Sequence, residues 1–169
     1  MLLLLASPAF AYVYWTKADV LASFFPGAAI EEQSYALSAD QSAAIAAQVG
    51  RPRSTYTIEI ARASGQVVGY AVVDQELGQH EPIDFAVAFG PDGTIARVEI
   101  LAYREAYGDG VRAAGFRAQF VGKRSASSMR AGKDIQIVSG ATISSRSVST
   151  GVKRAALVLD AWLADAAGT

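Results

Sequence analysis

Apolar and polar side chains alternate with a period of two through much of the middle of the chain, which is typical of β-strands. Between these segments lie short stretches such as Ser64–Gln66 and Pro91–Gly93, whose residues are typical of tight turns. Strands joined by such short turns pair antiparallel, so the pattern predicts an antiparallel meander. The predicted strands cover residues 55–60, 67–73, 85–89 and 95–103.

Helical patterns precede the predicted sheet. Thr16 comes before a short amphipathic segment, Lys17–Phe25, that ends at Pro26. Ser38 begins an Ala-rich segment with the spacing of a capping box, and this segment ends near Gly50. These patterns predict two helices on the N-terminal side of the sheet.

A Gly-rich loop at 107–110 follows the sheet, and it precedes a predicted helix over 111–121 and a predicted short strand over 135–138. A long helix is predicted after Thr142, because apolar residues recur there at spacings of three and four. The pattern as a whole predicts an α+β fold, with a twisted antiparallel sheet packed with helices and a long C-terminal helix. The apolar stripe of that helix consists of Val148, Val152, Ala155, Leu159 and Leu163.

The composition indicates one globular domain and excludes several kinds of site. The chain has 169 residues, of which 51% are hydrophobic and 18% charged, with no internal repeat and no linker. Cysteine is absent, which excludes thiolate-held iron–sulfur clusters, c-type haem, Cys-based zinc sites and cysteine nucleophiles. Any redox chemistry must therefore use a cofactor that needs no cysteine. A sequence pI near 5.8 argues against nucleic acid as a partner.

Charge is distributed unevenly along the chain. Residues 74–109 contain eight acidic residues and two arginines, whereas residues 112–154 contain nine basic residues and a single acid, Asp134. A basic C-terminal part favours an anionic ligand there. The alternative is that two solvated faces neutralise each other.

The first residues resemble the end of a secretory signal peptide. Met1–Ala11 is a leucine run followed by Ala9-Phe10-Ala11, with a helix-breaking Pro8 before it. The run is too short to span a bilayer, and its lack of a positively charged start is consistent with a true start upstream. We therefore expect an exported protein with a signal peptide at 1–11 and one domain at 12–169, not integral to the membrane after processing. The alternative is a buried N-terminal strand or helix.

Two further features carry weaker signals. Gly108-Asp109-Gly110 with Gly115 faintly resembles a dinucleotide-binding fingerprint, but the spacing differs and no βαβ unit surrounds it, so a loop is predicted. His80 is the single histidine of the chain, so it cannot build a three-His zinc site, and no nucleophile-elbow sequence accompanies it. We expect no metal site and no catalytic triad. His80 is either a ligand contact or a surface-loop histidine.

A hydroxyl-rich segment, Ser139–Ser145, lies just before the long helix. Gly140 allows the backbone to approach a ligand closely, and the N–H groups and dipole at a helix start favour a phosphate. Arg146, Lys153 and Arg154 add positive charge nearby in sequence. The segment therefore indicates either an anion site or an ordinary Ser/Thr N-cap.

The stretch 134–145, DIQIVSGATISS, closely resembles the flavinylation motif of the FMN-binding domain family. That family includes flavin-carrying subunits of Rnf complexes and Na⁺-translocating NADH:quinone reductases, and small exported proteins. The resemblance implies covalent FMN, joined through its phosphate to the Thr142 hydroxyl by a FAD:protein FMN transferase. It further implies electron transfer with a membrane or periplasmic redox partner. An FMN-dependent reductase of a small extracytoplasmic acceptor and a non-redox binding or assembly module remain the alternatives.

Three upstream segments, 78–83, 103–108 and 119–123, look like those of the small exported members, and the resemblance extends over about residues 60–164. It implies a set of cofactor-binding residues around the phosphate and near the flavin ring. Tyr103 has an alternative place in the core, and Arg104–Glu105 an alternative as a surface pair. The implied phosphate-side residues are Ser139, Gly140, Ala141, Thr142, Ser144 and Ser145. The implied ring-side residues are His80, Glu81, Tyr103, Glu105 and Tyr107.

Overall fold

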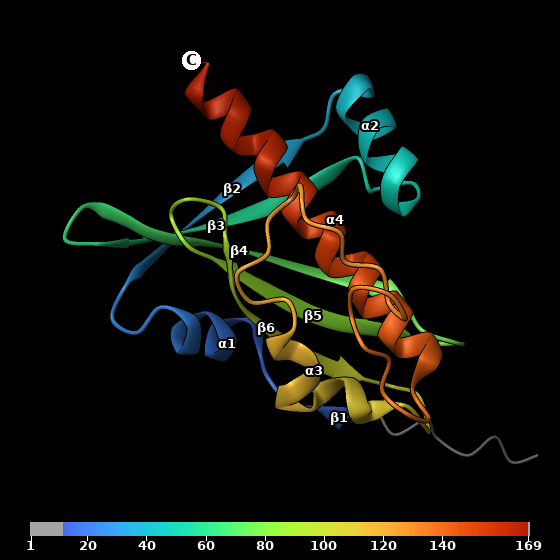
Figure 1. The fold of residues 1–169 in the computed structure, drawn as a ribbon. Coiled ribbons are helices and arrows are strands. Elements are labelled where there is room, and N and C mark those ends of the chain that lie inside the picture. Colours follow the sequence, from blue (N-terminus) through green and yellow to red (C-terminus); the bar gives the residue numbers. More distant parts are fainter. Residues whose placement is uncertain (1–11, 169) are drawn as a thin grey trace, which may run out of the picture.

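Consecutive hairpins build the centre of the molecule, as the alternating pattern predicts. The structure, a computed structural model, describes residues 12–168 (Figure 1). The described strands form one antiparallel six-stranded sheet in the order β1-β6-β5-β4-β3-β2. The strands are β1 (Tyr12–Val13), β2 (Ala29–Ala36), β3 (Thr55–Ala63), β4 (Gln66–Leu77), β5 (Pro82–Phe89) and β6 (Ile95–Tyr103).

Helices pack on both faces of this sheet, and the predicted α+β class is confirmed. The long C-terminal helix crosses one face diagonally, and the first helix lies on the opposite face (Figure 1). The helices are α1 (Lys17–Phe24), α2 (Ala39–Val49), the 3₁₀ helix η1 (Asp109–Arg112), α3 (Ala114–Ala118) and α4 (Thr142–Ala167). The predicted capping box is present, because Ser38 Oγ accepts from Gln41 N–H and the Gln41 side chain accepts from Ser38 N–H. The expected signal peptide at 1–11 lies outside the described residues.

Two predicted elements are wrong and two strands are additional. Residues 135–138 form no strand, because Val138 N–H is bonded to the Ser145 hydroxyl, and Ile135 makes only an isolated bridge. The predicted helix over 111–121 is instead η1 followed by α3, with an extended Ala113 (φ −56°, ψ 135°) between them. Strands β1 and β2 add to the two edges of the meander.

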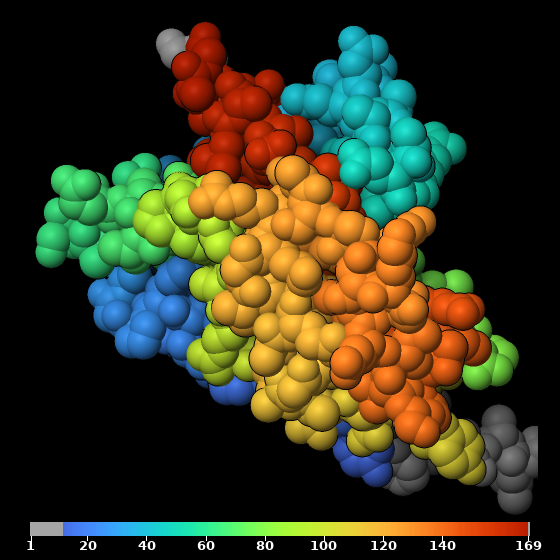
Figure 2. All heavy atoms as spheres, in the orientation of Figure 1, coloured from blue at the N-terminus to red at the C-terminus, as the bar shows by residue number. Residues whose placement is uncertain are grey.

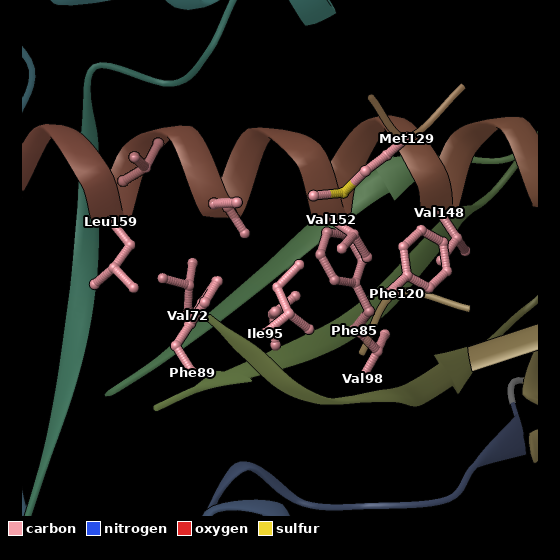
Figure 3. Packing of buried hydrophobic residues seen from close by; sticks show 14 of the residues in the cluster. Val72, Phe85, Phe89, Ile95, Val98, Phe120, Met129, Val148, Val152 and Leu159 are labelled. Carbon is pink, nitrogen blue, oxygen red and sulfur yellow. The ribbon is translucent and has the colours of Figure 1, made fainter. Parts of the chain in front are cut away.

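The face of the sheet under α4 holds the larger core. Most of the predicted apolar stripe is buried there, with Val148, Val152 and Leu159 lying over the sheet (Figure 3). Helix and sheet approach each other closely at Gly151, where a Cβ atom would lie 2.6 Å from Cε1 of the Phe85 ring. Glycine at this position therefore lets α4 lie directly on β5.

A buried ionic cluster ties α4 to β4. The Arg154 guanidinium contacts Asp74 (Nη2 to Oδ2, 3.1 Å) and Glu76 (Nη1 to Oε2, 2.5 Å), and Arg53 pairs with the other Asp74 oxygen. Burial acts against the charge of Arg154, but the two carboxylates outweigh it and raise the pKa of the guanidinium. The cluster keeps the first half of α4 in register with the sheet.

Candidate functional site

The motif segment turns sharply into α4. Gly140 has φ +76°, a conformation that favours glycine, and Ala141 N–H donates to the Val138 carbonyl (3.0 Å). The N-cap position is Ala141, which has no side chain able to cap the helix. The backbone N–H groups of the first turn therefore have no side-chain acceptor, and the expected alternative of a Ser/Thr N-cap is wrong.

The hydroxyl groups of the motif differ in what they contact. Ser145 is fully buried, and its Oγ accepts from Val138 N–H (3.1 Å). Ser144 is buried, and its Oγ lies 2.8 Å from Tyr103 Oη. Thr142 is exposed, and its hydroxyl has no hydrogen-bond partner within residues 12–168. Ser139 is likewise exposed, but it lies before the turn and outside the helix.

The loop after β6 packs against this helix start. Tyr103 Oη donates to the Tyr107 carbonyl (2.5 Å), so the Ser144 hydroxyl is left as the donor to Tyr103. Gly108 has φ +94°, and a Cβ there would lie 2.6 Å from Tyr103 Oη and 2.8 Å from Ser144 Oγ. A glycine is therefore required where the loop meets the motif. Tyr107 itself is 87% exposed.

The turn between β4 and β5 lies beside the second turn of α4. Ser147 Oγ donates to the Leu77 carbonyl (2.7 Å), and Glu105 accepts from the backbone N–H groups of His80 (2.6 Å) and Glu81 (3.2 Å). Burial of Glu105 opposes ionisation, but these hydrogen bonds together outweigh it and hold the pKa of its carboxyl below the ordinary glutamate value. The side chain of Glu105 thus positions the turn.

The structure brings the phosphate-side and ring-side residues into one region, although they come from separate parts of the sequence. Tyr103 is in the core, with its hydroxyl against the motif, and His80 is exposed. The expected alternative pairing of Arg104 with Glu105 is wrong, because Arg104 pairs with Asp84 (2.6 Å). Sequence reasoning missed Gly108 and Ser147 as parts of the site. The Gly-rich spacing at 108–110 was a signal for the first, and nothing in the sequence marked the second.

A helix start without a side-chain cap, with an exposed threonine hydroxyl and a supporting glycine loop, has the features of a phosphate-binding site. Residues 78–157 match the sequence model of the FMN-binding domain family. The expected membership of the FMN-binding domain family is thereby confirmed: residues 78–157 of this chain form an FMN-binding domain.

Two curated relatives are similar over more than half of the chain. A component of the proton-translocating ferredoxin:NAD(+) oxidoreductase complex of Clostridium ljungdahlii is 34% identical, over 56% of this chain and 55% of the relative. A component of the Na(+)-translocating ferredoxin:NAD(+) oxidoreductase complex of Acetobacterium woodii is 28% identical, over 64% of this chain and 58% of the relative. The chain thus matches somewhat more than half the length of each.

A solved structure has a similar fold. The crystal structure of NqrC from Shewanella oneidensis matches with a TM-score of 0.54 and 17% sequence identity, over 80% of this chain and 70% of that one. At this identity the likeness concerns the fold alone. Between residues 12 and 168, no helix combines the length and the apolar character needed to cross a membrane, and no group of three or more His, Asp or Glu side chains is placed to hold a metal ion.

Proposed function

We propose that FMN is attached to Thr142 through a phosphoester and that the chain is an electron-transferring flavoprotein. The observation that carries this proposal is the difference between the hydroxyl groups of the motif. Those of Ser144 and Ser145 are buried and hydrogen-bonded, whereas that of Thr142 is exposed at the start of α4. A modifying enzyme can therefore reach Thr142 while the other two hydroxyls hold the motif in place.

The residues around Thr142 fit the phosphate of FMN. The first-turn N–H groups of α4 have no side-chain cap, and the positive end of the helix dipole favours a negative group there. Arg146 lies one turn further along the same side of the helix as Thr142, which adds positive charge. Bound FMN supplies the capacity to accept and donate electrons, and the protein supplies its position and surroundings.

The ring-side residues divide into two groups on this proposal. Tyr107 and His80 are exposed, Tyr107 in the loop that packs against the motif and His80 in the β4–β5 turn, and both can contact the isoalloxazine ring. The half-buried Glu81 follows His80 in the same turn. Tyr103 and Glu105 position other residues and do not contact the ring themselves, because their polar atoms already bond to the 103–110 loop and the β4–β5 turn. Ser139, Gly140 and Ala141 shape the turn that presents Thr142.

The proposed partners and location are supported by the two relatives and by the sequence of residues 1–11. Two relatives are named as subunits of ferredoxin:NAD(+) oxidoreductase complexes, which supports a place for this chain as a flavin subunit of an Rnf-type membrane complex. A FAD:protein FMN transferase would mature it. The signal-like pattern at 1–11 supports export to the periplasm or the outer face of the membrane, with Tyr12 as the expected mature N-terminus.

The test is to produce the chain in an exporting host with and without the FMN transferase. We expect a yellow protein whose mass exceeds that of the bare chain by FMN less one water, and a flavin-fluorescent band after denaturing electrophoresis. Thr142→Ala should abolish the band while the circular dichroism spectrum is retained. Ser139→Ala is the matched control and should keep it. Modification that persists in Thr142→Ala would move the attachment to another hydroxyl, and a colourless wild type would overturn the proposal.

A further inference from the structure

A cavity lies along α4, on the C-terminal side of the 134–145 motif. It has a volume of about 600 Å³ and lies between the end of α2, the segment 126–131 and one side of α4. In Figure 2 the teal atoms of α2 adjoin the orange atoms of the segment around residue 130. The volume falls within the range of small-molecule sites, about 300 to 1,000 Å³. Thr142 is not among its lining residues, and Arg146 is the nearest one along the helix.

The charges that line this cavity are of one sign. Arg130, Arg146 and Lys153 line it, no carboxylate does, and none of the three forms an ion pair within 4 Å in residues 12–168. Asp134 lies near Arg130 in the same loop, but it accepts from Ser128 Oγ and from the backbone N–H of Arg130. Arg146 and Lys153 have no such acid beside them.

Lys153 is held in place without a counter-ion. Its Nζ donates to the carbonyls of Ser127 (2.9 Å) and Ser125, which fixes the ammonium group at the wall of the cavity. Burial lowers the pKa of this ammonium group, and no acidic neighbour offsets the effect. An anion bound in the cavity would remove this electrostatic cost.

The uncharged residues that line the cavity suit a planar aromatic ring. Val49 and the buried Met129 supply apolar surface, and Thr150 adds a hydroxyl whose hydrogen-bonding capacity is unused in the described part of the chain. A cavity lined by both cations and apolar side chains suits a ligand with an anionic head and a flat apolar body. Met is an adaptable contact for such rings.

We propose that this cavity is a second, noncovalent binding site for a phosphate-bearing aromatic ligand of mononucleotide size, separate from the attachment at Thr142. The ligand can be free FMN or an adenine nucleotide, since both combine a phosphate with a planar ring. The proposal does not depend on covalent flavin, because Thr142 does not line the cavity and, of the three cations that do, only Arg146 is shared with the proposed phosphate site at Thr142. It assigns the three cavity cations, Arg130, Arg146 and Lys153, to the phosphate group of that ligand.

The experiment uses calorimetric titration of the full chain, both as Thr142→Ala and with its covalent flavin. The probes are two matched pairs, AMP with adenosine and FMN with riboflavin, in which only the first member carries a phosphate. We expect saturable binding of AMP, FMN or both to each form of the protein, and at least tenfold weaker binding of the neutral partner. Which phosphate binds more tightly identifies the source of the ligand.

Variants locate the site. Lys153→Gln and, separately, the more exposed Arg130→Gln should each weaken binding several-fold, whereas Lys123→Gln, a cation outside the cavity, should leave it unchanged. Equal binding of neutral and phosphorylated probes, or unchanged affinity in both cavity variants, would overturn the proposal. Binding to Thr142→Ala that disappears once flavin is attached would also overturn it, because the cavity would then hold the attached flavin itself.

Discussion

The two faces of the sheet differ in how completely their charged side chains are paired. The face opposite α4 has a thin core, where Val20, Leu21 and Phe25 lie over alanines of the central strands. It buries two carboxylates, and both are paired, Glu59 with Lys17 and Glu99 with Arg97 and Arg117. The α4 side has the larger, aromatic core, and the cations of its cavity have no such partners.

Two cavities, one on each side of the sheet, differ in the same way. The one of about 410 Å³ on the α1 side is lined by Lys17, Arg53 and Arg104, each of which already pairs with a carboxylate. The larger one beside α4 is lined by cations without ion pairs. A paired charge is committed to the fold, whereas an unpaired one in a concave surface is available to a ligand. The count of charges in the sequence cannot distinguish these two cases.

The largest loss of stability is expected where a buried carboxylate on the α4 side loses its ion-pair partner. Arg154→Ala leaves Asp74, with a side chain only 1% exposed, without its buried partner. We expect a loss of about 3–5 kcal/mol in the free energy of unfolding, measured by denaturant titration. Arg124→Ala is the control, because its pair with Asp92 is exposed and should cost about 1 kcal/mol or less. Equal losses in the two variants would contradict the assigned role.

The next prediction concerns how closely α4 lies on the sheet. Gly151→Ala would place a methyl group 2.6 Å from Cε1 of the buried Phe85 ring, so the helix must shift. We expect a net destabilisation of about 1–3 kcal/mol from overpacking, although alanine is the better helix former. Combining it with Phe85→Leu should restore part of the loss, which calorimetric unfolding would measure. Gly115→Ala is the control, since its Cβ would meet nothing within 4 Å.

Periodicity predicted the centre of the fold because it reports burial. In the hairpins from β3 to β6, large apolar side chains on the α4 face alternate with mostly alanine or polar residues on the other face, and α4 has one apolar stripe, so both patterns are local in sequence. Strand β2 lacks it, since its residues are exposed almost throughout and include Glu31 and Glu32. The segment 135–138 was wrongly predicted as a strand, because the backbone N–H of Val138 donates to the Ser145 hydroxyl and not to a neighbouring strand.

The candidate site likewise has a part that the sequence predicts and a part that it does not. The 134–145 motif is contiguous, so sequence alone identifies it. The contact between Tyr103 and Ser144 joins residues 41 positions apart, and the 126–131 cavity wall meets both α2 and α4. Contacts between residues so far apart in the sequence depend on tertiary packing, and the local pattern of apolar and polar residues does not predict them. The uneven charge along the chain indicated an anion in the C-terminal part, and packing determines which of its cations are unpaired.

A pH-dependent prediction tests the α1 side. Burial raises the pKa of Glu59 above the ordinary value, and the ion pair with Lys17 only partly opposes this. Because the folded state resists ionisation, this carboxyl lowers the free energy of unfolding as pH rises through the ordinary value and then the folded value. Glu59→Gln should therefore be more stable than wild type at pH 7, by about 1 kcal/mol.

The comparison is made by urea titration at several pH values. The advantage of Glu59→Gln should vanish in acid, where the carboxyl is protonated in both states. Glu32→Gln, at the exposed partner of the same lysine, is the control and should show no gain in stability at pH 7. A Glu59→Gln variant less stable than wild type at pH 7 would mean that the Lys17 pair outweighs burial.

The smallest expected effect is at the loop that supports the motif. The pKa of Glu105 is held below the ordinary value, so its contribution to stability is present above that value and is lost as pH falls through the folded value. Glu105→Gln should cost about 1 kcal/mol at pH 7, since an amide oxygen accepts the N–H groups of His80 and Glu81 less strongly.

Hydrogen exchange at single amides tests this role of Glu105 in addition to the free energy of unfolding. Hydrogen exchange at the His80 and Glu81 amides should accelerate in Glu105→Gln at pH 7, and the wild type should approach the same rates relative to the free amides in acid. Asp109→Asn removes an exposed carboxylate from the same loop and should leave both amides protected. If wild-type protection did not change with pH, Glu105 would not hold the turn as a carboxylate, and the turn's position beside α4 would depend on Ser147 and its bond to Leu77 instead.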